Sequence, residues 1–138
     1  MLLGPLTHPD LLHALAAAGH GSQVLLADGN YPHATGANPG APRIHLNLRP
    51  GLLDVDQVLE AVHATVPIEA AAVMTPDGGA SVPAHESYRR LLGERVAWQE
   101  LGRFEFYDAC RGPDLAAVVA TGDQRLYANL LLTIGVRE

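Results

Sequence analysis

The chain has 138 residues, enough for one domain with a hydrophobic core and too few for two, so we expect a single domain over residues 1–138. Hydrophobic residues make up 48% of the chain and charged residues 17%, which excludes a disordered protein. The formal net charge of -6 excludes a basic nucleic-acid binder, and we expect neither nucleic acid nor a membrane among its partners.

The first predicted element is a helix within "THPDLLHALAAAGHG" (7–21). Thr7 is placed to cap its first turn, Pro9 fits that turn, and Gly19 supplies the left-handed residue that commonly ends a helix. One face carries the apolar residues Leu11, Leu12, Leu15 and Ala18. His20 therefore lies just beyond the carboxyl end of this helix.

A short apolar run, "SQVLLAD" (22–28), is typical of a buried strand at the centre of an α/β sheet, and it ends at Asp28. Residues 29–42 are rich in Gly, Pro, Asn and Ala, which predicts an irregular loop long enough to be functional. "RIHLNL" (43–48) predicts a second strand.

Helices and strands alternate through the rest of the chain. A helix is predicted over 54–67, with an inner stripe of Val55, Val58, Leu59, Val62 and Val66. The remaining elements are a strand over 69–74, a helix over 83–94, a strand over 95–101, a helix over 103–112, and strands over 114–122 and 129–135. This alternation predicts an α/β fold in a single domain, with a mostly parallel central sheet and helices on both faces.

Cys110 is the only cysteine, so the chain forms no internal disulfide, and among aromatic residues of a predicted helix it is expected to be a small core residue. "MLLGPLTHPD" lacks the basic and long apolar regions of a secretory leader. The apolar run "NLLLTIGV" is far shorter than the roughly 20 residues that span a bilayer. We therefore expect a cytoplasmic protein.

Several common sites lack their sequence motifs. The chain has no phosphate-binding loop, no dinucleotide fingerprint after a strand and no nucleophile elbow. His85 and Glu86 begin like a zinc-binding helix, but Arg89 stands where the second histidine belongs. We expect no metal and no cofactor.

Polar residues gather where the predicted strands end, which is where open parallel sheets bind ligands: Asp28, Asn30, His33, Asp123, Tyr127 and Asn129. His20 and Asp28 flank one strand, and a histidine oriented by a carboxylate suits proton transfer near neutral pH. The alternative is structural. In that case His20 bonds the last carbonyls of its helix and Asp28 only forms an Asx-turn.

Three segments together resemble the D-ribose pyranase and L-fucose mutarotase family: "LTHPDLLHALAAAGHGSQVLLAD", "RFEFYD" and "VVATGDQRLYANLLLTIGV". The resemblance covers essentially the whole chain. It implies a cofactor-free enzyme that interconverts the cyclic forms of a free monosaccharide. It also implies a homo-oligomer, often a decamer of two pentameric rings.

By position, the resemblance implies that His20 is the catalytic histidine and Asp28 its partner carboxylate, with both near one sugar. Tyr127 joins them as a catalytic residue. The substrate-binding residues implied are Asp28, Arg103, Tyr127, Ala128 and Asn129. Arg103 stands where ribose-type members have histidine, which favours L-fucose, with D-ribose pyranase as the alternative and a non-catalytic sugar-binding accessory protein as a third possibility.

The loop after Asp28 departs from the family pattern. Fucose-type members commonly read D-A-[NH]-F-P-A-[HS] here, whereas this chain reads "DGNYPHA", with Gly29 in place of alanine and His33 shifted by one position. No role is therefore carried over to His33. Tyr31 or Phe104 is the candidate apolar wall for the methyl group of fucose.

Overall fold

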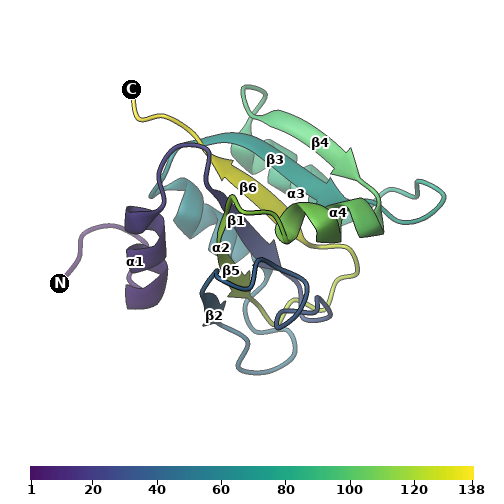
Figure 1. The fold of residues 1–138 in the computed structure, drawn as a ribbon, viewed down its shortest axis with the longest axis horizontal. Helices are drawn as coiled ribbons and strands as arrows, with labels where there is room; N and C mark the ends of the chain where they lie inside the picture. Colours follow the sequence, from purple (N-terminus) through teal and green to yellow (C-terminus); the bar gives the residue numbers. More distant parts are fainter.

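The computed structural model describes residues 1–138, and the six strands form one sheet in the order β2-β5-β1-β6-β3-β4 (Figure 1). The strands are β1 (Gln23–Ala27), β2 (Arg43–His45), β3 (Ile68–Met74), β4 (Ala97–Leu101), β5 (Leu115–Ala120) and β6 (Leu130–Ile134). The helices are α1 (Pro9–Ala17), α2 (Val55–His63), α3 (Pro83–Leu92) and α4 (Arg103–Cys110). Only β6 runs antiparallel to its neighbours, so the mostly parallel α/β fold is confirmed.

The position of β6 fixes the geometry of both ends of the sheet. The chain leaves β5, crosses the carboxyl end of β1 and returns between β1 and β3. Leu26 of β1 therefore pairs with Leu130, and Gln23 pairs with Thr133. As a result, the start of β6 lies beside the end of β1, and the end of β6 lies beside the starts of β1 and β3.

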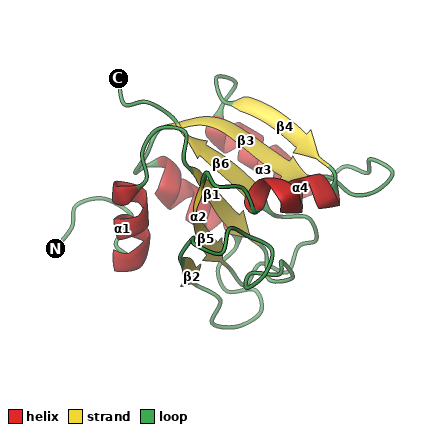
Figure 2. Ribbon diagram, viewed as in Figure 1, coloured by secondary structure: helices red, strands yellow, loops and turns green.

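Helices cover both faces of the sheet (Figure 2). On one face α1, α2 and α3 bury a core that includes Leu11, Leu59 and Tyr88. On the other face α4 and the loop after β1 bury a smaller core that includes Tyr31, Phe106 and Cys110. Cys110 is a core residue as expected, and burial raises the pKa of its thiol to about 11. No helix is long and apolar enough to cross a membrane.

Local sequence signals account for most of the boundaries of helices and strands. Three predictions need correction, the last residue of the α2 stripe, the cap of α1 and the end of β2. Asp54 and Gln57 form a reciprocal capping box at the start of α2, and Val55, Val58, Leu59 and Val62 are buried on its inner face as expected. Val66 was expected on the same face, but α2 ends at His63 and Val66 is only partly buried beyond it. The cap of α1 is His8 rather than Thr7, because the His8 ring accepts a hydrogen bond from the Leu11 N–H at 3.3 Å. The expected strand over 43–48 ends at His45.

Candidate functional site

Asp28 is buried at the carboxyl end of β1, where three backbone N–H groups donate to its carboxylate. Oδ1 accepts from Asn30 at 2.9 Å and from Tyr31 at 3.0 Å, and Oδ2 accepts from Ala128 at 3.2 Å. Burial raises the pKa of Asp28, and the three N–H groups oppose that rise. The Asx-turn is thus present. A carboxylate accepts about four hydrogen bonds, so one acceptor position remains for a ligand.

The Tyr127–Asn129 segment lies against Asp28. The Asn129 side chain accepts a hydrogen bond from the Asp28 N–H through Oδ1 at 2.8 Å, which leaves its Nδ2 group as a donor. Ala128 is fully buried; its N–H donates to Asp28 and its carbonyl accepts from Tyr88 at 2.7 Å. Asn129 thus has a donor to offer a sugar, whereas Ala128 serves to hold the segment.

Tyr127 is the only non-glycine residue with a positive φ, at 59°. Left-handed backbone is uncommon for a bulky residue, so neighbouring groups must hold it. The carbonyl oxygen of Tyr127 accepts a hydrogen bond from the His85 ring at 2.8 Å. The phenol, in contrast, makes no hydrogen bond within the chain and is half-buried.

Arg103 begins α4, just after the carboxyl end of β4, and is fully exposed. Its Nε donates to the Tyr107 hydroxyl at 3.3 Å, and its guanidinium lies 5.7 Å from the ring centres of both Phe104 and Tyr107. Tyr107, and more weakly Tyr127 and Asp77, raise the pKa of Arg103. The remaining N–H groups of Arg103 are therefore free to meet a ligand near Tyr127.

His20 lies at the opposite end of the sheet, where its Nε2 is 3.0 Å from Oε2 of Glu69. Glu69 is the second residue of β3, and His20 precedes β1, so the two flank the end of β6. Both side chains remain accessible, with 58% of His20 and 45% of Glu69 exposed. This is the one histidine–carboxylate pair in the molecule.

The expected pairing of His20 with Asp28 around one sugar is wrong for a single chain. The two residues lie beyond opposite ends of β1, and the strand between them alone is about 13 Å long at about 3.3 Å per residue. Both residues flank the same strand, and the length of that strand keeps their side chains apart. Within one chain, the partner of His20 is Glu69.

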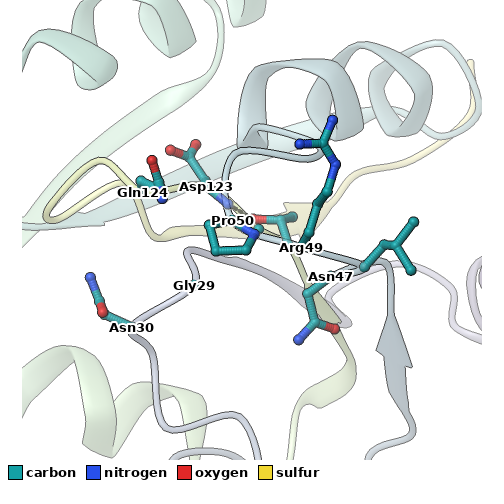
Figure 3. Close-up of a pocket in the computed structure, with 10 residues that line it drawn as sticks. Gly29, Asn30, Asn47, Arg49, Pro50, Asp123 and Gln124 are labelled. Carbon is teal, nitrogen blue, oxygen red and sulfur yellow. Dashed lines mark hydrogen bonds between the residues drawn. The ribbon is translucent and has the colours of Figure 1, made fainter.

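A cavity of about 540 Å³ opens beside Asp28 (Figure 3). Its walls come from the ends of β1, β2 and β5 and are mostly polar: Gly29, Asn30, Asn47, Leu48, Arg49, Pro50, Thr121, Gly122, Asp123 and Gln124. Figure 3 shows Pro50 near the centre, with Asn30 and Asn47 on either side. Of the polar residues expected at the strand ends, Asn30 and Asp123 line this cavity, whereas none of the residues that the family resemblance assigned to the sugar site does.

Two residues singled out from the sequence hold structure instead. Asp123 accepts a hydrogen bond from the Val55 N–H in the first turn of α2 at 2.9 Å and pairs with Arg125 at 2.6 Å. Burial works against ionised Asp123, yet these bonds hold its pKa below the usual range. His33 donates from its ring to the Asp28 carbonyl at 2.8 Å.

The two candidate walls for a fucose methyl group differ in access. Tyr31 is buried and donates its hydroxyl to the Gly36 carbonyl, whereas Phe104 is 74% exposed. Only Phe104 therefore has free surface to offer a ligand.

Sequence reasoning missed Glu69 and Tyr88, and it considered His85 only as a metal ligand. Glu69 is 49 positions from His20, and no local pattern joins them. His85 and Tyr88 carry a signal that was available, because they lie three residues apart on the buried face of α3. Their partners on the Tyr127–Asn129 segment are about 40 residues away and emerge only in the fold.

Comparison with known proteins gives one consistent result. A model of the RbsD / FucU transport protein family matches residues 1–137. A fucose mutarotase of Mus musculus is 37% identical over 143 residues, covering 94% of this chain and 90% of the relative. A D-ribose pyranase of Paracidovorax citrulli is 38% identical over 139 residues, covering 95% of each.

Among solved structures, the fucose mutarotase of Streptococcus pneumoniae in complex with L-fucose superposes over the full length of both chains. The TM-score is 0.85 and the sequence identity 28%.

Proposed function

Because the chain belongs to the RbsD / FucU transport protein family, we propose that it is a cofactor-independent isomerase that interconverts the anomers of free L-fucose. The observation that carries this proposal is the similarity to fucose mutarotases over at least 94% of the chain. Free polar groups on Asp28, Arg103, Tyr127 and Asn129 support it, since they are the kind that hold sugar hydroxyls.

Anomer interconversion requires two proton transfers and involves no net oxidation. One group removes the proton of the anomeric hydroxyl while another delivers a proton to the ring oxygen, so the bond from C1 to the ring oxygen breaks and an open-chain aldehyde forms. Rotation about C1–C2 and reclosure reverse both transfers and give the other anomer. A positioned acid or base contributes about 10² to 10⁴ in rate to such a step.

At the carboxyl end of β1, Asp28 accepts a hydrogen bond from a sugar hydroxyl and Asn129 donates one through Nδ2. Arg103 holds neighbouring hydroxyls through its planar set of N–H donors. The Tyr127 hydroxyl, which has no partner in the chain, assists proton transfer. Ala128 contributes to substrate binding indirectly, because it holds Tyr127 and Asn129 in place.

The catalytic histidine comes from a second copy of the chain. His20 cannot reach Asp28 in its own chain, so a site with both must place the His20 end of one copy against the Asp28 end of another. The same copy that supplies His20 also supplies Glu69, which orients the His20 ring. Exposed Phe104 and Leu126 beside Arg103 and Tyr127 support this contact, because they offer apolar surface for a second copy to cover.

A head-to-tail contact of this kind uses different surfaces on the two copies and closes into a ring when the rotation permits. The decamer of two pentameric rings is the assembly that fits this proposal and the family resemblance. The lone buried Cys110 is compatible with the proposed location in the cytoplasm.

D-ribose pyranase is the second candidate function, favoured by the 38% identity to a protein of that name. Both activities use the same ring opening and differ in how the sugar is held. Arg103 favours fucose because a guanidinium grips two hydroxyls at once, whereas a histidine offers a single contact.

We expect faster anomer exchange on L-fucose than pyranose–furanose exchange on D-ribose, measured by saturation-transfer NMR on the two free sugars. Arg103→His should slow fucose exchange about tenfold or more, since the charged, planar guanidinium can hold two hydroxyls and a histidine ring only one. Arg90→His, an exposed arginine on α3, is the control and should leave both rates unchanged.

Faster exchange on ribose by the unmodified protein would make pyranase the primary activity. Sugar binding without exchange on either substrate would support the accessory sugar-binding protein instead.

A further inference from the structure

The conformation of Tyr127 needs support that the sugar site itself does not supply. Its positive φ of 59° sets the direction of the phenol and of the Asn129 side chain that follows. From the side of the site, the one contact to this stretch of backbone is the Ala128 N–H bond to Asp28. The other contacts come from beneath, from α3.

His85 and Tyr88 make these contacts from adjacent turns of α3. The His85 ring donates through Nε2 to the Tyr127 carbonyl at 2.8 Å, and the Tyr88 hydroxyl donates to the Ala128 carbonyl at 2.7 Å. Tyr88 is fully buried and His85 is 8% exposed, so neither can contact a sugar. Burial also lowers the pKa of His85, which favours a neutral ring.

The peptide unit between Tyr127 and Ala128 is thus held from both sides, and the next unit is held from α3. Asp28 binds the N–H of Ala128, while α3 binds the carbonyls of Tyr127 and Ala128. Each α3 donor is a side chain anchored in the larger core, where Tyr88 packs with residues of α2 and the sheet. A rigid core therefore fixes the left-handed residue from which the phenol and the amide project.

We propose that His85 and Tyr88 are positioning residues that hold Tyr127 and Asn129 in register with the sugar. The inference rests on the proposed function and extends it, because these two residues act on the sugar only through the backbone that carries the Tyr127 and Asn129 side chains. Losing either donor leaves a buried carbonyl unpaired and lets the segment relax away from its left-handed conformation.

The test compares Tyr88→Phe and His85→Leu, which each remove one donor, with His85→Gln, whose amide N–H can replace it. Dissociation constants for L-fucose come from NMR titration, and kcat and KM come from saturation-transfer exchange. Tyr88→Phe and His85→Leu should weaken fucose binding and raise KM about five- to tenfold, the equivalent of one lost hydrogen bond. His85→Gln should restore most of that loss.

Ser87→Ala is the control on the same helix, since it removes bonds to Asp56 and the Ala84 carbonyl without touching the Tyr127–Asn129 segment. It should lower thermal stability and leave fucose binding and KM unchanged. A double-mutant cycle gives the sharpest readout. In an Asn129→Ala background, Tyr88→Phe should have much less effect on binding, because the group that it positions is gone.

Normal binding and KM in both Tyr88→Phe and His85→Leu, beside wild-type exchange, would overturn the inference and leave the proposed function intact. Equal losses in Ser87→Ala, or additive losses in the cycle, would also overturn it by showing a general effect of stability. If the wild type binds fucose without exchange, the proposed function fails and the binding measurements still decide the inference. A wild type that binds no fucose overturns both.

Discussion

His20→Ala should lower the rate of L-fucose anomer exchange by about 10² to 10⁴, the contribution of a positioned proton-transfer group. The fold should survive, because the ring is largely exposed and its one hydrogen bond is to Glu69. Saturation-transfer NMR at matched protein concentration measures the rate, and circular dichroism checks the fold.

His13→Ala is the matched control, an exposed histidine on α1 with no hydrogen bond in the chain, and should leave exchange unchanged. Glu69→Ala should give a smaller loss than His20→Ala, since the ring remains and only its orienting carboxylate is removed. Undiminished exchange in His20→Ala would refute the proposed role of His20.

Gly122→Ala should destabilise the protein by about 1–3 kcal/mol, the usual cost of forcing extra atoms into packed structure. A Cβ at Gly122 would overlap the backbone carbonyl oxygens of Arg49 and Leu52. Backbone cannot move aside as a flexible side chain can. The displacement would also weaken two hydrogen bonds, one from the Gly51 N–H to the Gly122 carbonyl at 2.7 Å and one from the Gly122 N–H to the Leu52 carbonyl at 3.1 Å.

Urea unfolding followed by circular dichroism measures this loss. Gly4→Ala is the control, because nothing lies within 4 Å of the Cβ that it adds and its φ is not positive. Equal unfolding midpoints for the two variants would contradict the close approach of Gly122 to the loop that contains Arg49 and Leu52.

Local sequence patterns predicted the helices and most strands because their causes are local. The stripe of Val55, Val58, Leu59 and Val62 repeats at helical spacing, and all four are buried. The Asx-turn at Asp28 follows from an aspartate ahead of Gly-Asn in the same way. The strand over 43–48 was overestimated because an apolar alternation there has no partner strand beyond His45.

The arrangement of the site could not be predicted from local pattern. The insertion of an antiparallel β6 between β1 and β3 depends on pairing across more than 100 residues, and it brings Asn129 to Asp28. The family resemblance pointed to both residues, but it gave no distances. His20 and Asp28 are only eight positions apart and flank one strand, and that nearness in sequence suggested a contact that an extended strand forbids.

The central claim is that each site takes His20 from one copy and Asp28 from another, and subunit mixing tests it most directly. His20→Ala protein and Asp28→Asn protein, the second expected to lose exchange less completely, are mixed in equal amounts under conditions that exchange subunits, with sedimentation confirming an assembly larger than one chain. In random mixed rings about a quarter of the sites combine an intact His20 with an intact Asp28. Our account predicts exchange near one quarter of the wild-type rate, and a mixture no more active than the average of its two parents would contradict it.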